Sequence, residues 1–338
     1  MQTSALRQRV CDELLGFAWS QWAQLGVLAE FGRRDQWAAD PEALLAFTLP
    51  IARRDPRLFD EVLDWLRANG RFLSLQRVRA VARDPEARSL ARAAIAWAAT
   101  YNPALRSWAR RTDAVPSASS DVLFRIDGEE AFVGEPDPIF LRFGWKRPRA
   151  EPSGKSQPPD LSAPINFAFR LRLALGLGVR AEIVRVLLTS GHPEPTAREI
   201  ADWVAFSKRN VNEGLNNLVE ADLLTASWRG RERSVRIDRE RWAAFLGLAV
   251  WELPRFVDWV RLLPALLAIL RWLDEDALLE RTAYLRESAG RRLLDELRPD
   301  LTLAGVSLPD DRGVRGPAFW RVFEQAVAAP LRILSSPS

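Results

Sequence analysis

The chain has 338 residues, a formal net charge of +4 and 48% hydrophobic residues. This length is enough for two or three domains, and the composition is that of a globular protein, which excludes general disorder. The single cysteine, Cys11, and the single histidine, His192, exclude an internal disulfide framework and a Cys/His metal site within one chain. We therefore expect no metal, no cofactor and a reducing, cytoplasmic location.

Residues 1–100 are predicted to form a helical N-terminal domain. The chain begins with apolar residues at helical spacing, which is typical of an amphipathic helix and not of a secretory signal. An aspartate followed by proline then occurs three times, at Asp40-Pro41, Asp55-Pro56 and Asp84-Pro85. Because aspartate is a preferred N-cap and proline suits the first helical position, each pair predicts the start of a helix. Asn69-Gly70 predicts the end of the second of these helices.

Tryptophan is unusually frequent, with fourteen residues in the chain. Many lie in helix-like segments, and we interpret them as large core anchors, with an aromatic ligand pocket as the alternative. The tryptophans in such segments are Trp19, Trp22, Trp65, Trp97, Trp203, Trp242, Trp259 and Trp272.

Residues 101–163 are rich in proline and are predicted to be a connector. Val122–Ile126 and Ile139–Phe143 alternate in hydropathy and could pair as a short hairpin, with Asp127-Gly128 between them. Arg147–Leu161 is polar and rich in proline and serine, so we expect a flexible linker and a domain boundary there.

Residues 164–253 are predicted to contain three helices in succession. Ala181–Leu188 has one apolar side, and Gly191–Pro195 ends this helix. Thr196 and Glu199 then have the spacing of a capping box, in which each side chain binds the other residue's backbone N–H. A short second helix follows and is expected to end near Ala205-Phe206.

Ser207 is a suitable N-cap for a third helix over Lys208–Val219. Its apolar residues, Val211, Leu215 and Leu218, form one stripe. The opposite face is polar and carries arginine and asparagine, the side chains that best make paired hydrogen bonds to guanine and adenine edges. Asparagine is a poor helix former, so its presence in mid-helix suggests contact with bases or phosphates, the alternative being a solvated face.

After this helix the hydrophobic period changes from 3.6 to 2, which predicts a hairpin. Leu223–Trp228 and Glu232–Ile237 are the expected strands, joined by a tight turn at Arg229–Arg231. Arginines at the tip suit contact with a phosphate backbone or an adjacent minor groove, whereas a solvated tip is the simpler alternative.

The segment from Ala197 to Leu224, followed by a basic hairpin, resembles the winged helix-turn-helix domains of ArsR- and MarR-type bacterial repressors. Ile200-Ala201 matches the second-helix signature and Phe206-Ser207 the start of the recognition helix. The resemblance covers residues 178–240 and implies a sequence-specific, dimeric regulator of transcription. We expect no membrane partner, because no run approaches the ~20 uncharged residues that span a bilayer. It places helix 207–219 in the major groove and wing 229–233 on the backbone or minor groove. The DNA-binding residues that it implies are Ser207, Lys208, Arg209, Asn210, Asn212, Glu213, Asn216, Arg229, Arg231 and Arg233.

Residues 254–338 are predicted to be helical again. We expect helices over Arg255–Leu273, Glu275–Glu287, Gly290–Leu297 and Phe319–Ala328. This region, together with residues 242–246 next to the hairpin, could form the dimer interface or the core of the C-terminal domain, and the sequence does not separate the two. The apolar residues concerned are Trp242, Phe245, Leu246, Leu262, Leu263, Leu266, Leu267 and Leu270.

The expected fold class is therefore mainly α, with segments 1–100, 101–163, 164–253 and 254–338. The preferred function is a DNA-binding transcriptional regulator, acting as a repressor, with a winged-helix protein-interaction scaffold as the alternative. The modest charge of residues 207–236, six basic against four acidic, keeps that alternative open. An enzyme has little support, because Gly176-Leu177-Gly178 lacks the third glycine of a dinucleotide loop and follows no predicted strand.

Overall fold

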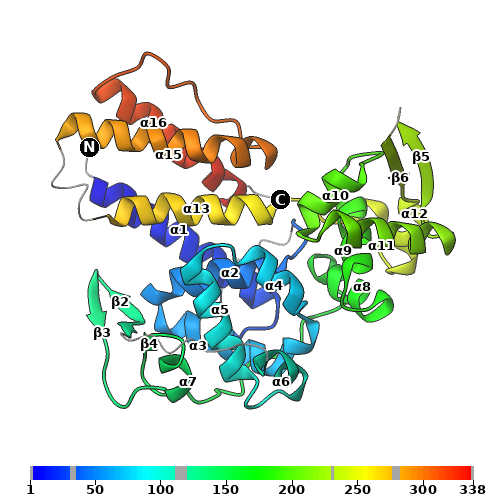
Figure 1. The fold of residues 1–338 in the computed structure, drawn as a ribbon, viewed down its shortest axis with the longest axis horizontal. Helices are drawn as coiled ribbons and strands as arrows, with labels where there is room; N and C mark the ends of the chain where they lie inside the picture. The colour runs from blue at the N-terminus through cyan, green and yellow to red at the C-terminus, as the bar shows by residue number, and fades with distance from the viewer. Residues whose placement is uncertain (1–2, 31–35, 111–119, 230–231, 276–281, 336–338) are drawn as a thin grey trace. The chain divides into compact units, whose positions relative to one another are not determined.

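Helices make up most of the computed structural model, which describes residues 3–30, 36–110, 120–229, 232–275 and 282–335 (Figure 1). The sheets formed by these residues have two strands each, so the prediction of a mainly α fold is confirmed. By compactness the chain separates into a larger unit, residues 19–257, and a smaller unit, residues 1–18 with 258–338. Helix α1 (Thr3–Gln24) contributes residues to both units.

The first part of the larger unit is a cluster of helices that begin as the sequence predicts. Asp40 accepts a hydrogen bond from the Ala43 N–H at 3.1 Å. Asp55 and Asp84 cap their helices in the same way. Each aspartate satisfies one backbone N–H that the first helical turn leaves unpaired. The helices are α2 (Pro41–Ile51), α3 (Pro56–Asn69), α4 (Leu75–Val81), α5 (Pro85–Ala98) and α6 (Pro103–Ala109), with 3₁₀ turns at Ala52–Arg54 and Gly70–Phe72.

The connector region contains a hairpin, but not the one expected. β2 (Phe124–Ile126) pairs with β3 (Glu129–Ala131) around Asp127-Gly128, and β1 (Asp121–Val122) pairs in parallel with β4 (Trp145–Lys146). The prediction of a strand over Ile139–Phe143 is wrong, because helix α7 (Pro138–Leu141) occupies that segment. Its N-cap is Asp137, whose side chain accepts from the Ile139 and Phe140 N–H groups, so the Asp-Pro signature outweighs the alternating hydropathy.

Residues 147–161 are irregular, as expected, but they are held against the helices and are not a free linker. The Asp64 carboxylate accepts from the N–H groups of Gly154 and Ser156 at 3.1 and 3.0 Å. The Gln157 N–H donates to the carbonyl of Gly26, which has a φ of +107°. A Cβ on Gly26 would lie 2.2 Å from the Gln157 carbonyl oxygen, so this close approach requires glycine.

The second part of the larger unit holds the helices and hairpin that the sequence indicates. Thr196 and Glu199 form the predicted capping box, with Thr196 N to Glu199 Oε2 at 2.7 Å and Glu199 N to Thr196 Oγ1 at 3.3 Å. The elements are α8 (Phe167–Leu175), α9 (Val179–Thr189), α10 (Ala197–Val204), α11 (Lys208–Glu220), β5 (Thr225–Arg229), β6 (Glu232–Arg236) and α12 (Arg239–Phe245), with 3₁₀ turns at Pro164–Asn166 and Val250–Glu252.

A single apolar core joins α8 to α12. Its fully buried members include Ile183, Ile200, Val211 and Val235. α11 crosses α9 at Gly214, where an added Cβ would lie 2.8 Å from Ile183 Cδ1 and 2.9 Å from Val179 Cγ1. Glycine in mid-helix therefore allows two helix backbones to approach closely.

The smaller unit contains α13 (Trp259–Asp274), α15 (Ala283–Leu303) and α16 (Pro317–Ser335). The two helices expected around Gly290 are one helix, because Gly290 lies under the Phe319 ring and does not end α15. Residues 276–281 of the expected helix Glu275–Glu287 lie outside the described residues. Among the helices of the described ranges, none is long and apolar enough to span a membrane.

Most of the tryptophans singled out in the sequence are core residues. Trp203 is partly buried and the other seven are buried, which confirms their interpretation as core anchors. Trp22 and Trp65 meet edge to face at 5.0 Å between ring centroids. The Trp22 N–H donates to Thr48 and the Trp65 N–H to the Leu25 carbonyl, so both polar atoms are satisfied inside the core.

Candidate nucleic-acid interface

Helix α11 presents one apolar and one polar side. The Ser207 hydroxyl accepts from the Asn210 N–H at 3.2 Å and so caps the helix. Val211, Leu215 and Leu218 are buried, as predicted. Most of the predicted contact residues on the helix are exposed, and Asn210 is half-buried. The exposed residues are Ser207, Lys208, Arg209, Asn212, Glu213 and Asn216.

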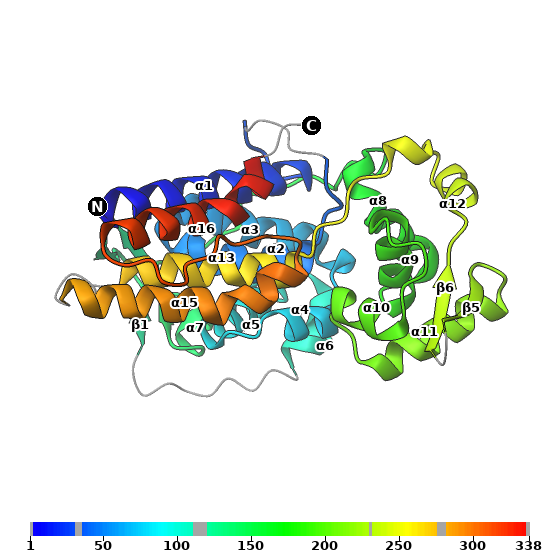
Figure 2. The same cartoon turned by 90° about the horizontal axis from the view of Figure 1, so that it is seen from above.

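The hairpin β5–β6 lies beside α11 (Figure 2). Antiparallel partners share a face of the hairpin, and Ala226 pairs with Val235 while Trp228 pairs with Arg233. Val235 is buried in the core, so this face is the inner one. The Arg233 guanidinium donates to the side-chain oxygen of Asn216 on α11. This bond brings the hairpin and the polar side of the helix into one surface, which we call the reading face and define as Lys208, Asn212, Asn216, Trp228 and Arg233.

The other predicted contact residues are placed less favourably. Arg209 is paired with Glu213 one turn along the helix, at 3.1 Å, and both side chains are well exposed. Arg229 is the last residue of β5. Arg231 lies outside the described residues. Arg209 on α11 and Arg236 on β6 are thus each paired with a carboxylate, since Arg236 contacts Glu194.

Trp228 belongs to the reading face, although the sequence reasoning did not select it. Its side chain is 72% exposed, whereas the earlier inner-face residue Leu224 is 4% exposed. The sequence does indicate the face on which Trp228 lies. Alternate residues of a strand share a face, so Trp228 lies on the same side as Ala226 and the buried Leu224. It lies beyond the core, near the tip, and so remains uncovered.

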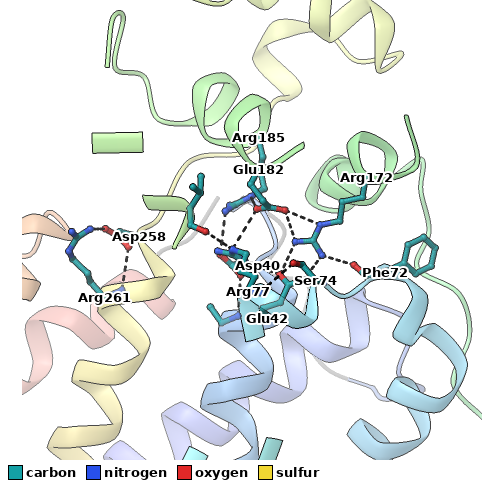
Figure 3. Close-up of polar contacts among 12 residues, drawn as sticks. Asp40, Glu42, Phe72, Ser74, Arg77, Arg172, Glu182, Arg185, Asp258 and Arg261 are labelled. Carbon is teal, nitrogen blue, oxygen red and sulfur yellow. Dashed lines mark hydrogen bonds and ion pairs between the residues drawn. The ribbon is translucent and has the colours of Figure 1, made fainter. Parts of the chain in front are cut away.

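A buried ion cluster lies where the first helices of the larger unit meet α8 and α9 (Figure 3). Each member is at most 6% exposed, and three arginines face three carboxylates. Charged side chains are rarely buried unless paired, and here the formal charges cancel. The members are Asp40, Glu42, Arg77, Arg172, Glu182 and Arg185.

Arg77 on α4 is the centre of the cluster. It makes a two-pronged contact with Asp40 and reaches Glu42 Oε2 at 2.8 Å. Its Nε donates to the carbonyl oxygen of Val204 at 2.9 Å. Val204 is the last residue of α10, where carbonyls lack intrahelical partners, so Arg77 caps this helix end. Ala205, next in the chain, has a left-handed φ of 54° and starts the turn into α11.

Arg172 on α8 and Arg185 on α9 complete the cluster. Arg172 binds Glu42 through both terminal nitrogens at 2.7 Å and Glu182 at 2.6 Å. Arg185 Nε donates to Glu182 at 2.8 Å. Bidentate Arg–carboxylate geometry makes these bonds strong and directional. The cluster therefore fixes α8, α9 and the end of α10 against α2 and α4.

The cluster also sets the protonation of its carboxyl groups. Burial alone would raise the pKa of Asp40, but Arg77 and Arg185 outweigh it and hold this pKa below its usual value. For Glu182, burial is likewise outweighed by Arg172, Arg185 and Arg77, and its pKa lies far below the usual value. Burial would lower the pKa of Arg172, and the carboxylates raise it instead. Asp40, Glu182 and Arg172 are therefore charged across the physiological range.

No metal site competes with these interpretations: in the described ranges, no group of three or more His, Cys, Asp or Glu side chains is arranged to hold a metal ion. Comparisons of the chain with family models, curated proteins and solved structures found no match. The case for a function therefore rests on the geometry of the reading face.

Proposed function

We propose that residues 178–240 are a winged helix-turn-helix and that the protein is a DNA-binding regulator of transcription, acting as a repressor. The observation that carries the proposal is the hydrogen bond between Arg233 on the hairpin and Asn216 on α11. It joins an exposed, asparagine-rich helix face to a basic hairpin, the combination that major-groove reading with a backbone-contacting wing requires.

The exposed side of α11 supports direct reading of bases. Lys208, Asn212 and Asn216 are spaced by four residues, so they follow one line along the helix. Asparagine can make two hydrogen bonds to adenine in the major groove, and lysine can contact guanine or a phosphate. On this model Arg209 contacts DNA only after it leaves Glu213, an exposed pair that costs little to break.

The proposed regulator acts as a homodimer on a palindromic site with half-sites about one helical turn apart. The interface that the sequence suggested in α13 is unsuitable, since Leu262, Leu263, Leu266, Leu267 and Leu270 are all buried within the chain. Of the residues next to the hairpin, Trp242 and Leu246 are buried and Phe245 is 62% exposed. A dimer contact near α12 would therefore use Phe245.

A mobility-shift titration with the protein's own promoter region tests the proposal. We expect a shifted complex that survives unlabelled competitor DNA and is lost in the double variant Arg209→Ala/Asn212→Ala. Arg106→Ala, an exposed residue of α6, is the matched control and should bind like the wild type. Binding that is unaffected by the double variant would exclude α11 as the recognition helix.

A protein-interaction scaffold is the second candidate, and the exposed aromatic residues Phe245 and Trp251 favour it. Such residues are typical anchors of protein interfaces. This function would leave the protein without affinity for duplex DNA in the titration above, and Phe245→Ala or Trp251→Ala would abolish capture of its partner.

A further inference from the structure

Trp228 is an exposed aromatic residue on the face of the hairpin that also carries the buried Val235 and Arg233, which bonds to α11. Its cross-strand partner is Arg233, and Arg233 is bonded to Asn216. A tryptophan that is 72% exposed leaves a large apolar surface in water, and the core ends before it. The stability of the fold does not explain why an exposed tryptophan occupies this position of the reading face.

The charges around Trp228 suggest which partner covers it. Arg233 lies opposite it, and Asn216 and Lys208 follow along α11. A surface that carries an exposed aromatic ring together with cations and amide groups suits a polyanion that also offers flat apolar surface, namely DNA, with its phosphates, deoxyriboses and bases. An apolar protein partner would not match this polar surround.

The modest positive charge around the reading face also supports a role for Trp228 in DNA binding. Arg209 and Arg236 are each paired with a glutamate, so few cations remain to neutralise phosphates. Affinity for DNA then needs a contribution that is not ionic. Packing of an aromatic ring on sugar or base provides one, because its strength does not depend on released counterions.

We propose that Trp228 is a DNA-contacting residue that packs against the deoxyribose and base edges of duplex DNA next to the groove occupied by α11, and that it supplies the salt-insensitive part of the affinity. This inference rests on the proposed function. The family resemblance does not name Trp228 as a contact residue, and it does not imply a salt-insensitive contribution to the affinity for DNA.

The test is a fluorescence-anisotropy titration of the full chain with a labelled duplex from its own promoter region and with the matching single strand, from about 50 to about 200 mM salt. Trp228→Ala should weaken duplex binding about tenfold or more at every salt concentration, with the slope of log K against log salt unchanged. Trp228→Phe should keep most of the affinity. Lys208→Ala, in contrast, should reduce the slope by about one.

Trp251→Ala is the matched control, because Trp251 is 84% exposed and lies outside the reading face. Its binding should equal that of the wild type, and both alanine variants should keep the wild-type melting temperature, since neither side chain is in the core. If Trp228→Ala binds like the wild type, the inference fails and the proposed function stands. Equal losses in both variants, or a preference for the single strand, would also overturn it. If the wild type binds no duplex at all, the proposed function itself fails.

Discussion

The buried ion cluster and the reading face use the same residue types for opposite purposes. In the cluster, Arg77 and Arg172 are at most 3% exposed and each contacts more than one carboxylate. On the reading face, Lys208 is exposed and the Arg233 guanidinium donates to the neutral amide oxygen of Asn216. The difference shows that burial, not residue type, decides whether an arginine holds the fold or is available for a ligand.

The buried cluster holds helices in place, whereas the side chains of the reading face are available to a ligand. The cluster reaches α10 through the Val204 carbonyl, immediately before the turn into α11. The interior charges thus fix where α11 starts, and under the proposed function the exposed charges are available to DNA. Four predictions test this difference, in decreasing order of expected effect.

The largest expected effect comes from Arg77→Ala. It leaves Asp40 buried without its main partner and takes one of two arginines from Glu42, and removal of one member of a buried pair typically costs about 3–5 kcal/mol. We expect the free energy of unfolding, measured by urea denaturation, to fall by about that amount. Arg106→Ala, an exposed arginine, should change it by less than about 0.5 kcal/mol. Similar losses in the two variants would contradict the contrast.

Acid should act on the same cluster. The pKa values of Asp40 and Glu182 are depressed in the folded state, so their contribution is complete above the unfolded-state values of about 3.9 and 4.3. Below that range the unfolded chain binds protons that the folded chain does not, and stability falls with pH. We expect the free energy of unfolding to decrease from about pH 5 downward. Glu182→Gln should show a shallower decrease, and an unchanged slope would refute this assignment.

Gly214→Ala tests how closely α11 is held to the interior. Alanine favours a helix by about 1 kcal/mol over glycine, but the new Cβ would be under 3.0 Å from Val179 and Ile183. Overpacking typically costs about 1–3 kcal/mol, so we expect a net loss of about 1 kcal/mol in thermal or urea unfolding. A more stable variant would mean that the two helices can separate without penalty.

The smallest effect is expected from Glu213→Gln on the surface. It removes a negative charge and releases Arg209, so affinity for duplex DNA at low salt should rise about two- to fivefold. The melting temperature should stay the same, because the pair is exposed. Weaker DNA binding would show that Glu213 itself contacts a base.

Local signals in the sequence predict much of this fold. Three Asp-Pro caps, the Thr196/Glu199 capping box and the period change after α11 all correspond to elements of the structure. These signals are local, involving residues a few positions apart. Ile139–Phe143 was misassigned because alternating hydropathy was preferred over the Asp137-Pro138 cap.

The buried ion cluster could not be predicted in the same way. Glu42 and Arg172 are 130 residues apart in the chain, and nothing local to either residue indicates the other. Similarly, the sequence predicts a new helix starting at Gly290, whereas this glycine lies inside α15 and against the Phe319 ring. On the candidate interface, the line of α11 residues was predictable, whereas the exposure of Trp228 depends on where the core ends.

One consequence of the cluster concerns how the protein can be divided. A fragment restricted to residues 164–253 would contain Arg172, Glu182 and Arg185 but would lose Asp40, Glu42 and Arg77. Two cations would then face one anion on a newly hydrated surface, and the end of α10 would lose its cap. Residues 164–253 are thus not a portable module: transplanting them requires α2 and α4 as well.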